Sequence, residues 1–436
     1  MGTPARYINT SICRSSHSPL LPFSLILLLS GILPVSVFSL GINYGQIANN
    51  LPPPDKVVPL VKAIGATKVK LYDADSKVLK AFAKTGIQFT VTVGNDLLPQ
   101  LAKDPKQSLD WVKKNVQGYL PDTNITCILI GNEVLTYNDT ILTSSLVPAM
   151  QNMHSALQKL GLDGDIWVTT AHNLAILDTS YPPSSGSFRQ DLSGCITQIL
   201  NFHSKTGSPF LINAYPYFAY KASPQEVNLD YVLLQAKTAN IMVDPDSNLH
   251  YDNMLYAQVD AVYAAMGPTF SKRVEVQVSE TGWPSKGDED EYGATPDNAK
   301  KYNGNLIKLF SNSAKKGTPM KPNCDLNVFV FALFNENMKP GPSSERNYGL
   351  FKPDGSPAYS LGFPTIQAVG NGSSYGADGP SSAAAETAAG SSGSGGGGRT
   401  SSSGYLSISS STERYPSAGL TVISLVMMMM GMVAVI

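Results

Sequence analysis

Eight short segments rich in apolar and β-branched residues recur between Leu40 and Ala368, and helical patterns separate most of them. The segments are residues 40–44, 69–72, 89–93, 126–130, 166–170, 210–214, 274–278 and 328–334. Most are continuous apolar runs, as is typical of strands buried on both faces of a parallel sheet. Eight such strands alternating with helices predict a (β/α)8 barrel, the TIM-barrel fold, over residues 40–368.

Helical periodicity fills several of the intervals between these segments. Apolar residues recur at helical spacing in residues 78–82, 109–116, 150–160 and 255–266, and more weakly in 192–202. A doubly wound sheet would instead show a glycine-rich phosphate-binding turn after its first strand, and residues 45–50 do not form one. In the predicted barrel, catalytic groups would lie at the C-terminal ends of the strands.

The N-terminal segment has the pattern of a secretory signal peptide. Arg6 and Arg14 precede an apolar stretch over residues 20–37, and Val37 and Ser39 are the small residues of a cleavage site. The alternative is a signal anchor that stays in the membrane. Because a strand pattern begins directly after Ser39, we expect cleavage there and assign residues 1–39 to the signal peptide.

The C-terminal segment predicts a glycosylphosphatidylinositol (GPI) anchor. Residues 369–404 are rich in Gly, Ser and Ala and are predicted to form a flexible stalk. Residues 405–436 end in an apolar tail without a basic flank, and the cluster of small residues at 401–404 suits lipid attachment at Ser403. The alternative is a transmembrane helix at the end of the chain. We expect a secreted monomer anchored at the outer face of the plasma membrane and facing the cell wall.

Composition and residue spacing exclude several classes of function. A formal net charge of −1 argues against a basic nucleic-acid-binding protein. The five histidines are scattered and no CxxC pair occurs, so we expect neither a metal nor another cofactor. Removal of Cys13 with the signal peptide leaves an odd number of cysteines, which predicts a free thiol or an intermolecular bond. Sequons at Asn124, Asn138 and Asn371 are candidate N-glycosylation sites.

Three predicted strands run directly into a glutamate. Glu133, Glu280 and Glu336 follow the fourth, seventh and eighth apolar runs. Each alone is more often a helix cap or a partner of a lysine, because burying an unpaired carboxylate is costly. Three on one face of a barrel favour a functional site.

A pair of carboxyl groups across a barrel mouth suits glycoside hydrolysis. One carboxylic acid protonates the leaving oxygen while the other carboxylate attacks the anomeric carbon, with the two groups about 5–5.5 Å apart in retaining enzymes. We assign this pair to Glu133 and Glu280, and Asn132 is placed to bind a sugar hydroxyl. Tyr44, Tyr215 and Trp283 lie near the same strand ends and can cover the apolar faces of sugar rings, although core packing is the alternative.

Several motifs in order resemble the plant family 17 glycoside hydrolases, the β-1,3-glucanases. They are Gly-Ile-Asn-Tyr-Gly at 41–45, Gly-Asn-Glu-Val at 131–134, Asn-Ala-Tyr-Pro-Tyr-Phe-Ala-Tyr at 213–220, Ser-Glu-Thr-Gly-Trp-Pro-Ser at 279–285 and Phe-Ala-Leu-Phe-Asn-Glu-Asn at 331–337. The resemblance extends over residues 40–363.

This resemblance implies a role for each matching position. Glu280 is similar to the nucleophile and Glu133 to the acid/base of the family, Asn213 to a substrate-binding residue, and Glu336, Lys339 and Glu345 to an ancillary charged cluster. The implied partner is a β-1,3-glucan such as callose. No cysteine follows Cys324, so a cysteine-rich carbohydrate-binding module is not expected. Two alternatives stay open: a catalytically silent glucan-binding protein, and a β-1,3;1,4-glucanase on the same fold.

Overall fold

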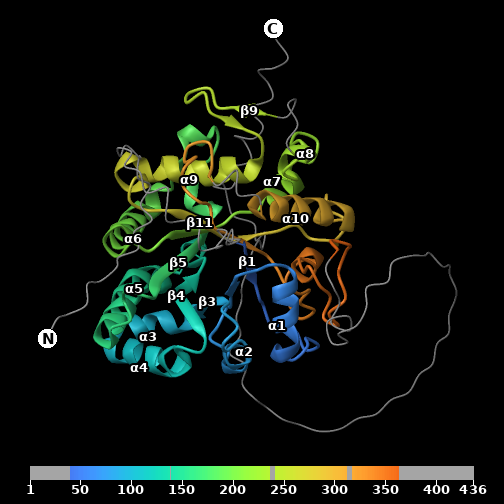
Figure 1. Ribbon diagram of the computed structural model, residues 1–436. Helices are drawn as coiled ribbons and strands as arrows, with labels where there is room; N and C mark the ends of the chain where they lie inside the picture. Colours follow the sequence, from blue (N-terminus) through green and yellow to red (C-terminus); the bar gives the residue numbers. More distant parts are fainter. Residues whose placement is uncertain (1–39, 138, 236–240, 312–316, 363–436) are drawn as a thin grey trace, which may run out of the picture.

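The computed structural model describes residues 40–137, 139–235, 241–311 and 317–362. Eight parallel strands close into a barrel in the order β1-β12-β11-β8-β5-β4-β3-β2, and helices surround it (Figure 1). The barrel strands are β1 (Leu40–Asn43), β2 (Lys68–Lys70), β3 (Gln88–Val93), β4 (Asn124–Asn132), β5 (Trp167–Asn173), β8 (Phe210–Asn213), β11 (Val276–Thr281) and β12 (Val328–Val330). This arrangement confirms the predicted (β/α)8 fold, in which each barrel strand pairs with the next one along the chain.

Helices follow most of the barrel strands and pack their apolar faces against the barrel. They are α1 (Pro54–Ala63), α2 (Ser76–Ala81), α3 (Leu98–Lys103), α4 (Pro105–Asn115), α5 (Thr140–Leu160), α6 (Ser193–Thr206), α7 (Pro216–Ala222), α8 (Leu229–Val232), α9 (Met254–Ser271) and α10 (Pro296–Ser311). Helix α5 ends at Gly161, whose left-handed conformation, with φ 68°, is one that favours glycine at a helix end. Gly267 does not end α9 but kinks it, with φ 68° and ψ 170°.

Two antiparallel ribbons interrupt the alternation of strands and helices. One pairs β6 (Leu177–Thr179) with β7 (Ser187–Phe188), and the other pairs β9 (Met242–Val243) with β10 (His250–Tyr251). Both lie outside the barrel, so they leave its strand order unchanged. The β6–β7 ribbon packs against α9.

The last barrel strand is shorter than the apolar run that predicts it. Strand β12 ends at Val330. Beyond it, the N–H groups of Phe331 and Leu333 still donate to carbonyls at the ends of β11 and β1, while the backbone of Ala332 and Leu333 also pairs with a second loop, at Tyr348, Leu350 and Phe351. These backbone hydrogen bonds redirect the chain toward the barrel mouth. Glu336 therefore lies in a loop that is fixed by a second loop, not at a strand end.

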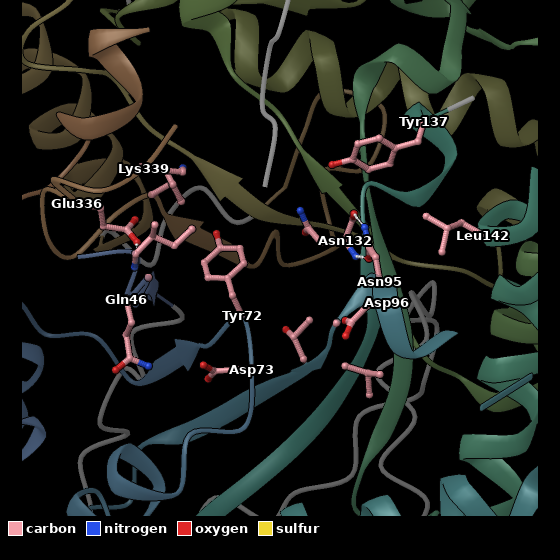
Figure 2. Close-up of a pocket in the computed structure, with 16 residues that line it drawn as sticks. Gln46, Tyr72, Asp73, Asn95, Asp96, Asn132, Tyr137, Leu142, Glu336 and Lys339 are labelled. Carbon is pink, nitrogen blue, oxygen red and sulfur yellow. Dashed lines mark hydrogen bonds between the residues drawn. The ribbon is translucent and has the colours of Figure 1, made fainter. Parts of the chain in front are cut away.

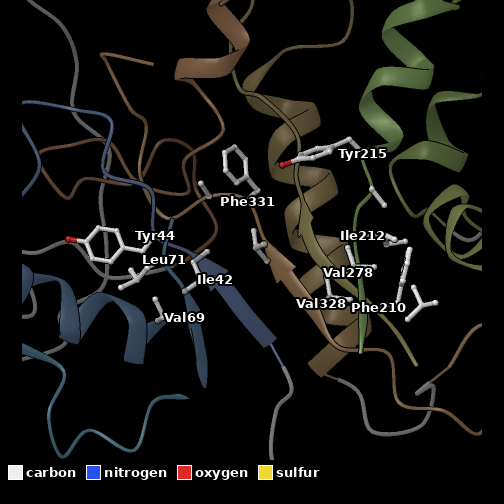
Figure 3. Packing of buried hydrophobic residues seen from close by; sticks show 14 of the residues in the cluster. Ile42, Tyr44, Val69, Leu71, Phe210, Ile212, Tyr215, Val278, Val328 and Phe331 are labelled. Atoms are coloured by element: carbon white, nitrogen blue, oxygen red, sulfur yellow. The ribbon is translucent and has the colours of Figure 1, made fainter. Parts of the chain in front are cut away.

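The core is formed by apolar side chains from all eight barrel strands and the surrounding helices. Ile42, Val69, Phe210, Ile212 and Val278 have no exposed surface (Figure 3). Burial of such side chains removes apolar surface from water on both faces of the sheet, which is the main driving force for this architecture. The packed core consequently holds the ends of the barrel strands rigidly.

Several predictions fall on residues that the structure does not describe. These are the signal peptide 1–39, most of the C-terminal part with the stalk 369–404 and the anchor signal 405–436, Ser403, and the sequons at Asn138 and Asn371. Within the described ranges, no helix is long and apolar enough to cross a membrane. Asn124 is exposed at the start of β4, and Cys127 and Cys195 are free thiols.

Substitution of Gly131 tests how tightly the chain is packed at the barrel mouth. It has φ +66°, and a Cβ atom there would lie 2.6 Å from Val134 Cγ2 and 2.8 Å from Asn95 Oδ1. We expect Gly131→Ala to lower the free energy of unfolding by about 1–3 kcal/mol, because it combines backbone strain with steric overlap. The measurement is chemical denaturation. Gly164→Ala is the matched control, since nothing lies within 4 Å of its Cβ position. Equal stability of the two variants would contradict this account.

Candidate active site

The two predicted catalytic carboxyl groups lie at the C-terminal ends of β4 and β11. Strands β5 and β8 separate β4 from β11 in the barrel, and both contribute an asparagine to the space between the glutamates. Glu133 and Glu280 are each only 4% exposed. The barrel therefore holds two nearly buried carboxyl groups on neighbouring walls of one site.

Glu133 is held by its backbone and by two asparagine side chains. It adopts a left-handed conformation with φ 55°, and its N–H donates to the carbonyl of Ala171 at 2.9 Å. Asn213 Nδ2 donates to its Oε1 at 2.7 Å, and Asn173 Nδ2 donates to its Oε2 at 3.3 Å. Burial, followed by the like charge of Glu280, raises the pKa of Glu133 to about 7, although these amides oppose the shift.

Glu280 has the opposite electrostatic environment. Lys70 Nζ lies 2.6 Å from its Oε1, and the hydroxyl of Tyr72 donates to the same oxygen at 2.7 Å. The hydroxyl of Tyr215 donates to Oε2 at 2.9 Å. Burial by itself raises the pKa of Glu280, but the charge of Lys70 and these hydrogen bonds outweigh burial and lower it below its usual value.

The two environments divide the carboxyl groups between two chemical roles. At mildly acidic pH, Glu133 is protonated and can give up a proton, while Glu280 is ionised and can act as a nucleophile or base. Pairs of carboxyl groups with pKa values shifted apart in this way are the recurring arrangement of acid–base catalysis.

A second charged cluster lies beside this pair on the loops after β12. Lys339 Nζ is 3.2 Å from Glu345 Oε2 and 4.3 Å from the ring centroid of Phe331. Burial lowers the pKa of Lys339, but the charges of Glu345, Glu336 and Glu280 outweigh burial and raise it. Glu336 accepts a hydrogen bond from the N–H of Ile47 at 2.7 Å. Lys339 is thus kept as a cation whose charge acts on Glu280.

The loop that carries Glu345 is fastened by another buried carboxylate. Glu291, in the loop after β11, accepts hydrogen bonds from the backbone N–H and the hydroxyl of Ser344 at 2.8 and 2.5 Å. Lys221 Nζ, at the end of α7, lies 2.8 Å from the same carboxylate. These contacts tie the loops after β8, β11 and β12 together and fix the position of Glu345.

A cavity of ≈ 280 Å³, here called the main cavity, opens over the ends of β1 to β4 (Figure 2). Tyr72 and Asn132 connect it to the catalytic pair, since Tyr72 bonds to Glu280 and Asn132 precedes Glu133. Asn95 fixes Asn132 through two hydrogen bonds to its backbone, at 2.8 and 3.1 Å. The lining mixes apolar surface with amide and carboxylate groups: Gly45, Gln46, Ile47, Tyr72, Asp73, Thr92, Val93, Gly94, Asn95, Asp96, Asn132, Tyr137, Leu142, Phe331, Glu336 and Lys339.

Six of the eight predicted binding residues lie in or beside the site. Asn132, Glu336 and Lys339 line the main cavity. Asn213 and Tyr215 contact the catalytic carboxyl groups, and Glu345 pairs with Lys339 as described above.

Two aromatic residues occupy positions other than those predicted. Trp283 has no exposed surface, and its Nε1–H donates to the carbonyl of Gly293 at 2.8 Å. Tyr44 is 1% exposed and packs against Phe334. Neither side chain lines the main cavity. A side chain without accessible surface cannot cover a sugar ring, so the structure assigns Trp283 and Tyr44 to the packing beneath the site.

Sequence reasoning missed Lys70 and Asn173. Lys70 is buried at the end of β2 and is the cation closest to the predicted nucleophile. Its signal was weak: a lysine stands between Val69 and Leu71, in a segment too short to form a continuous apolar run. Asn173 ends β5, and nothing in its neighbourhood in the sequence distinguishes it.

Comparison with known proteins identifies the family. The family model for glycosyl hydrolases family 17 matches residues 40–363. The chain belongs to glycosyl hydrolases family 17. It is 59% identical over 360 residues to glucan endo-1,3-beta-glucosidase 11 of Arabidopsis thaliana, covering 83% of each chain. It is 61% identical over 354 residues to glucan endo-1,3-beta-glucosidase 10 of the same plant, covering 80% of this chain and 82% of that relative.

Solved structures agree with the family assignment. A β-1,3-glucanase and pollen allergen of Cryptomeria japonica is similar with a TM-score of 0.69 and 38% identity, over 74% of this chain and 98% of that one. One of two plant β-glucan endohydrolases with distinct substrate specificities is similar with a TM-score of 0.67 and 38% identity, over 74% of this chain and 100% of that one. The protein is therefore a glycoside hydrolase with a family 17 barrel.

The contact between Lys70 and Glu280 predicts a specific pH dependence. Glu280 is the predicted nucleophile and can act as one only when ionised, so we expect activity to fall as the pH drops through its pKa. Lys70→Met removes the opposing charge and leaves burial, which raises this pKa. We expect the acidic limb of kcat/KM on laminarin to move upward by about 1–3 pH units.

Lys68→Met is the matched control for this experiment. Lys68 lies two residues earlier on β2, and its Nζ donates to Asn327 Oδ1 at 2.7 Å, away from the carboxyl pair. Its removal should leave the acidic limb in place. A Lys70→Met enzyme with an unchanged acidic limb would show that Lys70 does not control the ionisation of Glu280.

Proposed function

We propose that this protein hydrolyses internal β-1,3-glucosidic bonds in β-1,3-glucans such as callose, with retention of anomeric configuration. The observation that carries the proposal is the pair of buried carboxyl groups with opposite environments, Glu133 with its pKa raised to about 7 and Glu280 with its pKa lowered. The names of the relatives at 59% and 61% identity support the linkage.

In the first step, the Glu133 carboxylic acid transfers its proton to the glycosidic oxygen as the bond from that oxygen to C1 breaks. The Glu280 carboxylate forms a bond to C1 and gives a glycosyl-enzyme ester. Lys70, Tyr72 and Tyr215 hold the nucleophile in place, since all three contact its carboxylate oxygens.

In the second step, the Glu133 carboxylate takes a proton from water while the water oxygen forms a bond to C1. The ester bond to Glu280 breaks, which releases the sugar and restores both groups to their starting states. Activity should therefore fall at low pH as Glu280 becomes protonated, and it should fall above about pH 7 as Glu133 loses its proton.

Two other functions differ in what they require of the site. A silent glucan-binding protein would have no need for both carboxyl groups or for the buried cation that keeps one of them ionised. A β-1,3;1,4-glucanase would use the same pair, and the solved relatives include plant β-glucan endohydrolases with distinct substrate specificities. Product lengths from laminarin, barley mixed-linkage glucan and carboxymethyl cellulose distinguish these possibilities, and cleavage of laminarin alone supports the proposal.

The roles of the two glutamates can be separated with an activated aryl β-glucoside of suitable length. Glu133→Gln should still form the glycosyl-enzyme, because a good leaving group needs no protonation, and then stall for lack of a base. Added azide should restore turnover and give a β-linked azide product. Glu280→Gln should give an α-linked product if azide rescues it at all. The products are distinguished by NMR.

Glu275→Gln is a suitable control for these variants, because Glu275 precedes β11 at the opposite end of the barrel from the site. It should keep wild-type activity on laminarin. If the two azide products had the reverse configurations, the roles of Glu133 and Glu280 would be exchanged. Wild-type rates on laminarin for both site variants would remove the basis of the mechanism.

We also propose that the mature protein is secreted and held at the outer face of the plasma membrane by a GPI anchor near Ser403. The support is the pattern of the sequence: a signal peptide over residues 1–39, a stalk over 369–404 and an apolar terminal segment.

Phosphatidylinositol-specific phospholipase C tests the anchor. The enzyme should release the protein from intact cells, and the released form should lack residues 405–436 by mass spectrometry. A variant with Asp in place of the four small residues at 401–404 should lose surface anchoring if lipid is attached there. Recovery of the intact terminal segment from the wild-type mature protein would contradict the proposal.

A further inference from the structure

A second cavity adjoins the main cavity on the outer rim of the barrel mouth. This rim cavity has a volume of ≈ 230 Å³ and is lined by Asp73, Ala74, Asp75, Thr92, Gly94, Leu97, Trp111 and Asn115. Asp73, Thr92 and Gly94 line both cavities. The two cavities therefore adjoin at these three residues.

The rim cavity is built from one aromatic side chain and several hydrogen-bond acceptors. Trp111, on α4, is half-buried: it packs against the hydrophobic core and also lines the rim cavity. Asp75 Oδ1 accepts from the first N–H groups of α2, at 2.6 and 3.2 Å, and Asp73 Oδ1 accepts from the N–H of Asp75 at 3.0 Å. Asn115 Nδ2 donates to the carbonyl of Trp111 at 3.0 Å.

These bonds fix the acidic and amide groups and leave part of each available. Each aspartate uses one carboxylate oxygen within the fold, and Asn115 uses its donor group, so the second carboxylate oxygens and Asn115 Oδ1 remain as acceptors in the described structure. A ligand suited to this wall has several hydroxyl donors and one apolar face. A pyranose has both features, whereas an anion would be repelled by the two carboxylates.

We propose that the rim cavity is a further glucosyl-binding subsite, in which Trp111 covers one face of a glucose unit and Asp73, Asp75 and Asn115 accept its hydroxyl groups. This inference rests on the proposed function, because the sugar belongs to the glucan held in the main cavity. Two sources supply the same chemistry: a distant unit of the main chain, or a glucosyl branch that leaves the main chain over Asp73.

Kinetics can detect such a subsite because it lies away from the reacting bond. Loss of a distant stacking contact weakens binding of glucans that reach it and leaves shorter substrates unaffected. We expect Trp111→Ala to raise KM about tenfold on the glucans that fill the rim cavity, the equivalent of about 1.4 kcal/mol. The values of kcat and KM on the shortest cleaved laminari-oligosaccharide should stay at the wild-type level.

The substrates distinguish the two sources of the sugar. Wild type and Trp111→Ala are compared on a graded series of linear laminari-oligosaccharides and on branched laminarin. A loss that begins at a particular linear chain length identifies the main chain as the occupant. A loss confined to branched laminarin identifies the branch. Trp111→Phe should recover most of the lost affinity, because it restores a flat apolar face.

Trp167→Ala is the matched control, since Trp167 is 44% exposed at the start of β5, on the opposite end of the barrel from the mouth. It should behave as wild type on every glucan. Asn115→Ala gives a second variant that leaves the aromatic surface in place and should weaken binding of the same glucans. The subsite is refuted if both Trp111→Ala and Asn115→Ala keep wild-type KM throughout, or if they lose activity equally on the shortest substrate.

Glucan binding to a catalytically inactive variant tests the subsite independently of the proposed function. The Glu280→Gln variant, with and without Trp111→Ala, is run in affinity gels containing laminarin. Retardation that Trp111→Ala weakens supports the subsite even if the wild-type protein cleaves no glucan. Equal retardation of both proteins refutes the subsite, while cleavage of laminarin by the wild-type protein would leave the proposed function standing.

Discussion

The ion pair between Lys70 and Glu280 is the interaction on which the site depends. Both side chains are almost fully buried, at 1% and 5% exposure, with 2.6 Å between Lys70 Nζ and Glu280 Oε1. Burying one ion alone costs several kcal/mol, and the pair persists because hydrogen bonds from Tyr72 and Tyr215 satisfy the remaining carboxylate positions. Lys70 is the largest of the influences that keep Glu280 ionised inside an apolar barrel, ahead of Tyr72 and Lys339. The negative charge of Glu280 in turn helps to keep Glu133 protonated.

The eight strands could be predicted because burial on both faces demands continuous apolar runs. The same rule identified Glu133 and Glu280, since a charge directly after such a run is out of place unless it has a partner. Lys70 was not predicted because β2 is short and its sequence, Lys-Val-Lys, has the alternating pattern of an ordinary edge strand. Trp283 was assigned to substrate contact because it is close to Glu280 in the sequence, but closeness in the sequence does not determine where a side chain points. Two residues beyond β11 the chain turns inward, and the indole packs against Tyr217 and Tyr302.

The loop segments after β12 were the least predictable part of the site. Their positions depend on pairing between residues 332–335 and 348–351 and on the anchoring of Ser344 by Glu291, and neither contact leaves a local pattern. The resemblance to family 17 named Glu336, Lys339 and Glu345, but periodicity could not have placed them together. Long-range hydrogen bonds between loops determine where these charges lie relative to the strand ends.

Charge balance within the site distinguishes Glu133, the proposed acid, from the other buried glutamates. The site holds two buried lysines and four buried carboxyl groups. Lys70 contacts the carboxylate of Glu280, and Lys339 contacts that of Glu345. The two carboxyl groups without a lysine contact are Glu133 and Glu336, and burial raises the pKa of both. At Glu336 the charge of Lys339 and a hydrogen bond from the N–H of Ile47 oppose this rise, and the like charges of Glu345 and Glu280 add to it less strongly. At Glu133 the like charge of Glu280 is the largest cause after burial. The fold thus leaves the proton on the carboxyl group that faces the scissile oxygen in the proposed reaction.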